Sequence, residues 1–234
     1  MMWGWFDPVY LLFLAPAMLL AVWAQFKVQS AYREASQVPA RSGLSGAQAA
    51  DAVLHQAGVR GVQIEPVEGF LSDHYVPGEH VLRLSTEVYA GRSLAALGIA
   101  AHESGHAIQD ARRYPLLGAR NALVPLASVG SNLSWVVLVA GFLLHSMALI
   151  GLGILVFSAV VLFQLVNLPV EFDASRRARL ALVEGGLVSP DEAVEVKRVL
   201  DAAALTYVAA TLTSVMTLLY FLFRSGLLGQ RSND

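Results

Sequence analysis

Three long stretches of this 234-residue sequence contain no Asp, Glu, Lys or Arg side chain. They cover residues 8–26, 121–170 and 202–223. A helix that crosses the hydrocarbon core of a bilayer needs about 20 apolar residues. The first and third stretches each fit one such helix, and the second is long enough for two. The sequence therefore predicts a mainly α-helical membrane protein with about four transmembrane helices.

We expect these helices at residues 8–26, 125–144, 148–166 and 202–223, with a bend near His145 between the second and third. The alternative is a soluble protein with buried core helices. Only 15% of the residues are charged, whereas a soluble domain usually has about a quarter. Helices of this length without charges are rare in water, so the membrane interpretation is favoured.

The charged side chains are concentrated on one side of the predicted bilayer. All but four of them lie in the polar segments 27–120 and 167–201 that connect the predicted helices. Basic residues near membrane helices favour the cytoplasm, and the opposite side has only Arg224 and Arg231. We therefore predict that the polar segments face the cytoplasm and that both termini are extracytoplasmic. In a bacterium the protein would lie in the inner membrane.

Composition excludes several other classes of protein. The chain has no cysteine, which excludes disulfide-rich scaffolds, cysteine-based zinc fingers and iron–sulfur proteins. The formal net charge is −2, so there is no basic excess of the kind that nucleic-acid binding requires. The expected partner is the lipid bilayer, and no oligomeric state is predicted.

The longer polar segment has the pattern of a small α+β domain. Ser45 and Gln48 form a capping-box pattern at the start of a short helix, and Ser93 can cap a second helix that extends to about residue 112. Between them, residues 62–67 and 80–84 favour β-structure. We expect a β-hairpin or a three-stranded sheet in which Pro66 marks an edge strand.

The second helix contains the pattern H-E-x-x-H at His102, Glu103 and His106. Histidines four residues apart lie on the same helix face, so both can bind one zinc ion. Glu103 lies about 100° around the helix and can accept a proton from a water molecule on that ion. A chance pentapeptide is the alternative. Apolar residues precede the motif, however, and unpartnered polar groups are costly in such surroundings.

A catalytic zinc ion needs a third protein ligand. Glu171 and Asp173 follow the third predicted span, and only one of them can face the metal because they are two residues apart on a helix. Glutamate commonly joins two histidines, so we predict Glu171 as the ligand and keep Asp173 as the alternative. Asp173 or Asn167 can instead hydrogen-bond a ligating histidine. The other histidines fit less well, because they lie on a surface helix, beside a turn or across the membrane: His55, His74, His80 and His145.

The chain resembles the YugP family of neutral zinc membrane peptidases over nearly its whole length. The resemblance is clearest in four segments: residues 73–75, 100–109, 120–125 and 168–178. That family is similar to the HtpX and Ste24 membrane zinc endopeptidases, in which an E-F-x-A-D run supplies a zinc-binding glutamate. The resemblance implies a membrane-embedded zinc endopeptidase with a zincin-like domain. Ser175 stands where that group has aspartate, so the hydrogen-bond partner of the zinc ligands stays open.

The predicted activity is hydrolysis of a peptide or membrane-protein substrate by a zinc-activated water molecule. His102, His106 and Glu171 would bind Zn²⁺, and Glu103 would act as the base. An extended substrate could add to an edge of the sheet as a further strand. A basic or phenolic side chain should stabilise the developing oxyanion. The candidates for that role are Tyr75, His74 and Arg176.

Three other functions remain open. A site-2-type intramembrane protease would need H-E-x-x-H inside a membrane span, but the charged residues Asp110, Arg112 and Arg113 follow the motif closely. A non-catalytic adaptor or chaperone would hold a structural zinc ion with four protein ligands. A transporter is disfavoured because the predicted spans contain no ionisable side chain apart from His145 at the bend.

Overall fold

The computed structural model describes residues 7–69 and 72–227. These residues belong to two compact units. The first unit comprises Met1–Trp23, Ala119–Leu168 and Tyr207–Asp234, and the second comprises Ala24–Gly118 and Pro169–Thr206.

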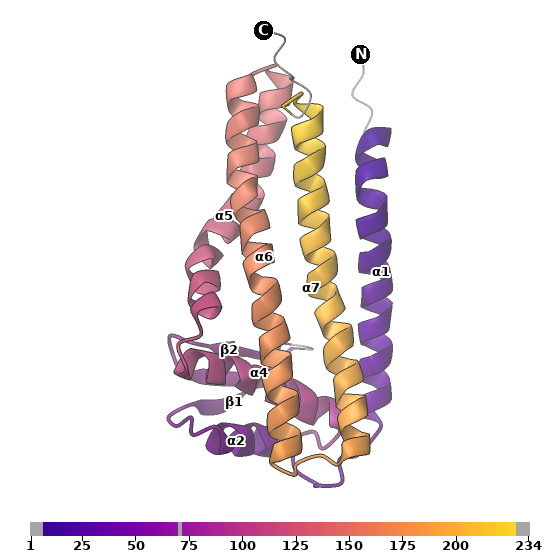
Figure 1. Ribbon diagram of the computed structural model, residues 1–234, viewed down its shortest axis with the longest axis vertical. Helices are drawn as coiled ribbons and strands as arrows, with labels where there is room; N and C mark the ends of the chain where they lie inside the picture. Colours follow the sequence, from indigo (N-terminus) through magenta and orange to yellow (C-terminus); the bar gives the residue numbers. More distant parts are fainter. Residues whose placement is uncertain (1–6, 70–71, 228–234) are drawn as a thin grey trace. The chain divides into compact units, whose positions relative to one another are not determined.

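Four helices among the described residues are long and apolar enough to cross a membrane (Figure 1). They are α1 (Pro8–Ser36), α5 (Pro115–Leu143), α6 (Met147–Glu184) and α7 (Pro190–Arg224). This confirms the prediction from the charge-free stretches. Each helix extends beyond its charge-free stretch because the flanking sequences are rich in good helix formers such as Ala, Leu, Arg and Glu.

The predicted bend between the second and third spans is also confirmed. Helix α5 ends at Leu143, α6 begins at Met147, and His145 between them adopts a left-handed conformation with φ of 53°. A backbone in this region reverses direction within a few residues, which accounts for the short connection.

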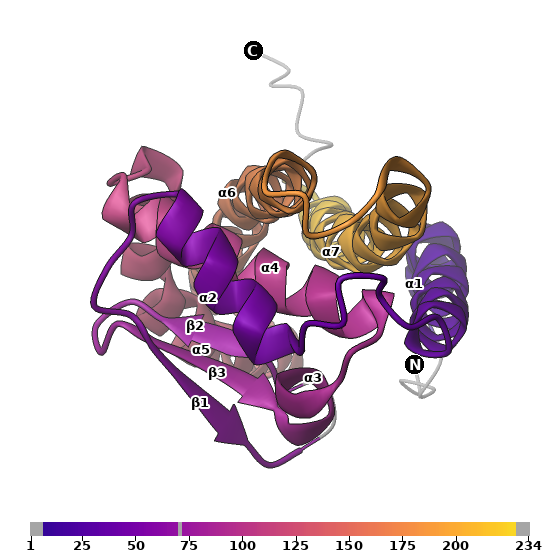
Figure 2. The same ribbon diagram turned by 90° about the horizontal axis from the view of Figure 1, so that it is seen from below.

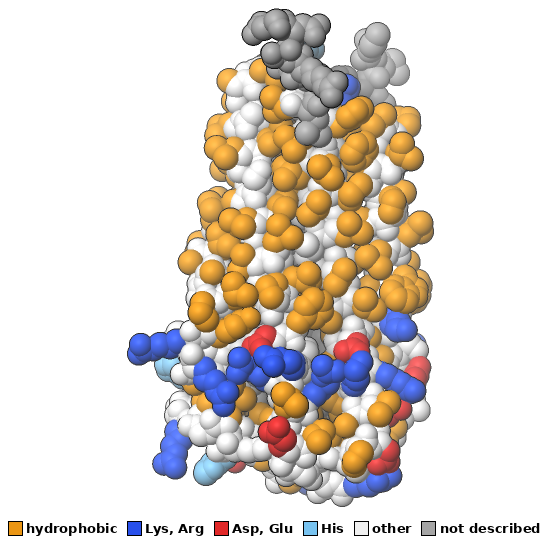
Figure 3. Space-filling model, in the orientation of Figure 1, with side chains coloured by type: hydrophobic (Ala, Val, Ile, Leu, Met, Phe, Trp, Pro, Cys, Tyr) orange, Lys and Arg blue, Asp and Glu red, His pale blue; other side chains and the backbone are white. Residues whose placement is uncertain are grey.

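The first unit has few charged side chains and an apolar exterior (Figure 3). Its described part contains a buried cluster that includes Leu138 and Ile150, together with the aromatic residues Tyr220 and Phe221. Large apolar side chains such as Leu155 and Leu12 are exposed on its helices. A surface of this kind is stable in lipid rather than in water.

The second unit contains a three-stranded sheet in the order β1-β3-β2, formed by β1 (Gln63–Val67), β2 (His74–Val76) and β3 (Val81–Ser85). The two strands expected at residues 62–67 and 80–84 are present as β1 and β3, but they pair in parallel, so a hairpin between them is wrong and the three-stranded alternative holds. The antiparallel hairpin is formed by β3 and β2, a strand that the sequence did not identify. Pro66 lies on β1, an edge strand, as predicted. Proline has no N–H group for the hydrogen-bond ladder of a central strand. An edge strand tolerates it because one side of that strand has no neighbour to accept such a bond.

Three helices accompany this sheet: α2 (Gly46–Gln56), α3 (Thr86–Ala90) and α4 (Leu94–Ala111) (Figure 2). Leu82 and Leu84 of β3 are fully buried and form one apolar cluster with Ala50 of α2 and Ala100 of α4. The sequence did not predict α3. Its five residues are too few to give a helical pattern of apolar positions.

The predicted helix caps are present. Ser45 and Gln48 form the capping box at the start of α2, and the side chain of Ser93 accepts a hydrogen bond from the backbone N–H of Ala96 at the start of α4. These bonds satisfy backbone N–H groups that a helix terminus otherwise leaves without partners. The cap at Ser93 therefore fixes where the helix with the H-E-x-x-H motif begins.

Candidate metal centre

Helices α4 and α6 approach each other closely at Gly105. A Cβ atom at this position would lie 2.6 Å from the backbone oxygen of Ala174, well inside van der Waals contact. Only glycine therefore allows the two helix backbones to come this near. This close approach places the face of α4 that carries His102 and His106 beside the part of α6 that directly follows the charge-free stretch of that helix.

Three side chains meet at this contact: His102 and His106 from α4, and Glu171 from α6. The Oε2 atom of Glu171 lies 3.3 Å from Nε2 of His102 and 3.6 Å from Nε2 of His106. One ligand atom from each residue lies within 4.8 Å of the other two. The side chain of Glu171 is only 4% exposed, so this carboxylate is held away from solvent.

The oxygen Oε2 of Glu171 is buried and has no hydrogen-bond partner among the described residues. A buried carboxylate oxygen without a partner is costly. Two imidazole nitrogens and one carboxylate oxygen form a donor set that zinc binds in many hydrolases. The three residues thus fit a zinc ion, which would satisfy the unpartnered oxygen.

Gln109 fixes the orientation of His106. The Nδ1 atom of His106 lies 3.0 Å from Oε1 of Gln109, while Nε2 of Gln109 donates to Val170 and to the carboxylate of Asp173. The amide nitrogen thus faces two acceptors, so its oxygen must accept from His106. The proton of His106 then lies on Nδ1, which leaves Nε2 free to bind a metal.

Ser175 has the corresponding place beside His102. Its hydroxyl oxygen lies 3.1 Å from Nδ1 of His102 and can accept a hydrogen bond from the N–H group of the ring. The sequence left this partner open, since Ser175 stands where the HtpX and Ste24 group has aspartate. The contact turns Nε2 of His102 toward Glu171.

The charges of the metal-free cluster favour a proton on His106. Burial opposes a charge on His106, but the adjacent carboxylate of Glu171 and the charge of Glu103 raise the pKa of His106. Burial likewise disfavours the ionised form of Glu171, yet the adjacent imidazoles of His102 and His106 hold the pKa of Glu171 well below its usual range. A metal cation would take the place of this proton.

Glu103 lies beside the cluster but is not one of its three ligands. Its side chain is partly buried, and its charge acts on two groups. It raises the pKa of His106, as described above. It also adds to burial in raising the pKa of Asp73, whose carboxylate accepts hydrogen bonds from the backbone N–H and hydroxyl of Ser85. The position of Glu103 near His106 suits a group that acts on a metal-bound molecule.

The three oxyanion candidates have other bonds. The hydroxyl of Tyr75 donates to Asp110 over 2.9 Å, and burial, together with this bond, raises the pKa of Tyr75. The ring of His74 is exposed and its Nδ1 lies 2.7 Å from the backbone oxygen of Ser72. Arg176 is bonded to Asp173. Among the described residues, no hydrogen bond or ion pair joins any of the three to the cluster of His102, His106 and Glu171.

Asp173 is connected to the cluster of His102, His106 and Glu171 through Gln109. Its carboxylate accepts from Gln109, Arg176 and Arg177, and thereby supports the amide that holds His106. Hydrogen bonds from these three groups outweigh burial and lower the pKa of Asp173. Asn167, the other candidate partner of a ligating histidine, instead accepts from Arg120.

Gln109 was not identified from the sequence. The signal was present, because a residue three positions after His106 lies on the same face of the helix. A glutamine with no exposed surface is unusual, but burial is visible only in the folded structure.

Comparison with known proteins identifies a family and a curated relative of this chain. A family model described as "Putative neutral zinc metallopeptidase" matches residues 10–226. A curated relative from Bacillus subtilis (strain 168), "Putative membrane protease YugP", is 47% identical over 205 residues, which cover 88% of this chain and 91% of the relative. No solved structure gives a significant match. The chain therefore belongs to the family of neutral zinc metallopeptidases that this model describes.

Proposed function

We propose that this protein is a membrane-embedded zinc endopeptidase with a zincin-like site at the cytoplasmic boundary of the bilayer. The observation that carries the proposal is the buried, unpartnered oxygen of Glu171 facing the free Nε2 atoms of His102 and His106. Such a donor set needs a cation. The site lies on the H-E-x-x-H helix of a chain that belongs to a zinc metallopeptidase family.

In this proposal His102, His106 and Glu171 hold the zinc ion, and Gln109 and Ser175 keep the two rings in the required tautomer. A zinc ion held in this way supplies a water molecule with a lowered pKa and polarises the carbonyl of the substrate. Glu103 takes the proton from the attacking water and passes it to the leaving amine.

The substrate would be an extended peptide, or an unfolded segment of a membrane protein. Strands β1 and β2 are the two edges of the sheet, and β2 is the edge that contacts α4. A peptide that pairs with β2 would form backbone hydrogen bonds with this strand. It would then lie beside α4, the helix that carries Glu103. Tyr75 on this strand stays a candidate for stabilising the oxyanion, together with His74 and Arg176.

A cytoplasmic orientation of the site is supported by the distribution of basic residues. Almost all Lys and Arg side chains lie in residues 27–120 and 167–201, and both termini would then be extracytoplasmic. In a bacterial cell this places the protein in the inner membrane. The chain has no cysteine, so single cysteines at Ser42 and Met147 can be labelled without background. A membrane-impermeant maleimide should label intact cells only at Met147→Cys.

The intramembrane-protease interpretation receives less support. Helix α4, which carries the motif, has 18 residues and is not one of the four helices suited to crossing a membrane. The adaptor interpretation differs from the peptidase proposal in one measurable property. A structural zinc ion would have a fourth protein ligand where a catalytic zinc ion has water.

The test of the proposal is Glu103→Gln in the full-length protein, reconstituted with zinc and an unfolded protein substrate. We expect the variant to bind zinc normally and to lose roughly 10²- to 10⁴-fold in cleavage rate, because only the base is removed. Glu87→Gln, which changes an exposed glutamate of α3, should cleave at the wild-type rate. Wild-type cleavage by Glu103→Gln would refute the mechanism.

A further inference from the structure

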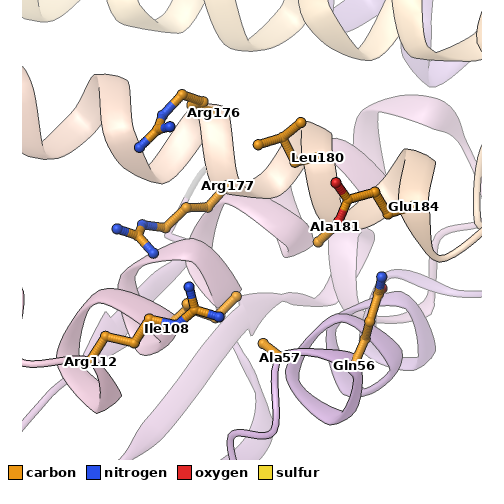
Figure 4. A pocket seen from close by; sticks show the side chains of 9 residues that line it. All are labelled: Gln56, Ala57, Ile108, Arg112, Arg176, Arg177, Leu180, Ala181 and Glu184. Carbon is orange, nitrogen blue, oxygen red and sulfur yellow. The ribbon is translucent and has the colours of Figure 1, made fainter.

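The second unit contains a cavity at which three arginine side chains meet. Its volume is about 370 Å³. Arg112 lines it from the end of α4, and Arg176 and Arg177 line it from α6. In Figure 4 the three arginines occupy one end of the cavity, while Glu184 lies toward the other end.

The charges at this cavity are unbalanced. Arg176 and Arg177 share one partner, the buried carboxylate of Asp173. Arg112 is exposed, and the described residues provide no ion pair for it. Glu184 is the only acidic side chain in the lining. Three cations face two anions, so the cavity attracts a further negative charge.

The chemistry of the lining favours a phosphate group. A guanidinium group can donate two parallel hydrogen bonds to phosphate oxygens, and it is only weakly hydrated. The side chain of Arg176 is 62% exposed and can contact a ligand while it stays paired with Asp173, whereas that of Arg177 is 18% exposed and lies over the ring of Tyr114. One arginine is therefore fixed, and the other two can close on an anion.

The position of the arginines along α6 indicates where the phosphate comes from. Val170 is the last residue of the charge-free stretch, and Arg176 follows it by six positions in the same helix. Six residues correspond to a rise of about 9 Å, slightly more than the headgroup layer of about 5–8 Å on each side of the hydrocarbon core. Helix tilt and the length of an arginine side chain shorten the distance further.

The remaining lining suits a glycerophospholipid. Leu180 and Ala181 of α6 and Ile108 of α4 provide an apolar wall that can contact the carbon atoms of the headgroup alcohol, because Leu180 and Ala181 lie beyond the arginines as seen from the charge-free stretch. Glu184 can accept hydrogen bonds from hydroxyl groups at the far end of a headgroup. A free phosphate ion would use only the arginine end.

We propose that this cavity binds the headgroup of an anionic glycerophospholipid, with its phosphodiester held by Arg112, Arg176 and Arg177. The proposal goes beyond peptide hydrolysis and rests only on the membrane placement of α6. Its test measures lipid binding, so the two proposals fail separately.

The experiment uses native mass spectrometry of the full-length protein in a neutral detergent, with dioleoylphosphatidylglycerol and dioleoylphosphatidylcholine as probes. We expect phosphatidylglycerol to bind at least about tenfold more tightly than phosphatidylcholine. The double variant Arg112→Gln/Arg176→Gln should lose most of this difference. Arg112→Gln alone should lose about half of this difference on a logarithmic scale. This single variant remains informative if the double variant does not fold, because Arg112 has no ion pair with the described residues.

The matched control is Arg113→Gln. This exposed arginine directly follows Arg112 and does not line the cavity. Its replacement changes the net charge equally and should alter the lipid Kd by less than twofold. An equal loss in Arg113→Gln would indicate a diffuse basic surface and overturn the proposal.

Two further results would also overturn it. The first is displacement of phosphatidylglycerol by submillimolar inorganic phosphate, which would identify a site for free phosphate. The second is a peptide with a free carboxyl terminus that binds in the micromolar range and loses affinity in the double variant, while lipid binding does not change. That outcome would assign the cavity to the substrate.

Discussion

The amide oxygen of Gln109 accepts a hydrogen bond from Nδ1 of His106 over 3.0 Å. The direction of this bond follows from the other end of the amide, which donates to Val170 and Asp173. One buried amide thus fixes the tautomer of a proposed metal ligand and connects it with a second carboxylate.

Gln109→Ala should weaken zinc binding by roughly 10- to 100-fold, because His106 would lose the acceptor that holds its proton on Nδ1. The affinity can be measured by competition with a fluorescent chelator in detergent. Gln63→Ala, which removes an exposed glutamine of β1, is the control and should have no effect. Unchanged zinc affinity in Gln109→Ala would show that His106 does not depend on this bond.

Ser175→Ala should lower zinc affinity by about tenfold, since His102 would lose the hydroxyl 3.1 Å from its Nδ1. Ser175→Asp should restore the affinity, because a carboxylate accepts the same proton more strongly. Ser104→Ala provides the matched control. Ser104 is also buried, but its hydroxyl donates to the backbone oxygen of Ala100 within α4. If Ser175→Asp bound zinc as weakly as Ser175→Ala, the hydroxyl would have another role.

Gly105→Ala should destabilise the second unit by several kcal/mol, because the new Cβ would lie 2.6 Å from the backbone oxygen of Ala174. Gly118→Ala is the opposite case. No atom lies within 4 Å of a Cβ at Gly118 in helix α5, so we expect up to about 1 kcal/mol of stabilisation. Thermal unfolding in detergent compares both variants with the wild type. A normal melting temperature for Gly105→Ala would mean that α4 and α6 can separate without cost.

The zinc-free protein should lose stability as the pH rises. The raised pKa of His106 contributes stability below its ordinary value of 6.5, and this contribution is lost as the pH rises through the raised value. The lowered pKa of Glu171 contributes stability above its ordinary value of 4.5. The pair is therefore most stabilising between about pH 4.5 and 6.5.

This pH dependence can be measured as the melting temperature of chelator-treated protein at pH 6 and pH 8.5. The difference between wild type and His106→Gln isolates the contribution of the pair. We expect the difference to be larger at pH 6. Bound zinc should reverse the trend, because protons compete with the metal for His106. A larger difference at pH 8.5 without zinc would contradict the assigned charges.

Much of the fold could be predicted because two physical constraints act directly on the sequence. Charged side chains are excluded from the bilayer core, so the absence of charge located the four long helices. Helical spacing placed His102 and His106 on one face, and zinc chemistry then selected Glu171 among the carboxylates. The structure brings this glutamate to within 3.3 Å of His102.

The rest depends on contacts between distant segments, which no local pattern encodes. Gln109 and Ser175 meet the histidines only because α4 and α6 cross at Gly105. Tyr75 was a candidate for the oxyanion, but its hydroxyl bonds Asp110 across the contact between β2 and α4. No local pattern indicates that pairing, because it depends on how the hairpin packs on the helix.

The central claim is that His102, His106 and Glu171 hold a zinc ion with a position left for water. Zinc X-ray absorption spectroscopy of the full-length protein, loaded with one equivalent of the metal, tests it most directly. We expect two imidazole nitrogens and two oxygen ligands, and the loss of one oxygen ligand from the protein in Glu171→Ala. Absence of tight zinc binding, three or more imidazole ligands, or an unchanged spectrum in Glu171→Ala would contradict the account.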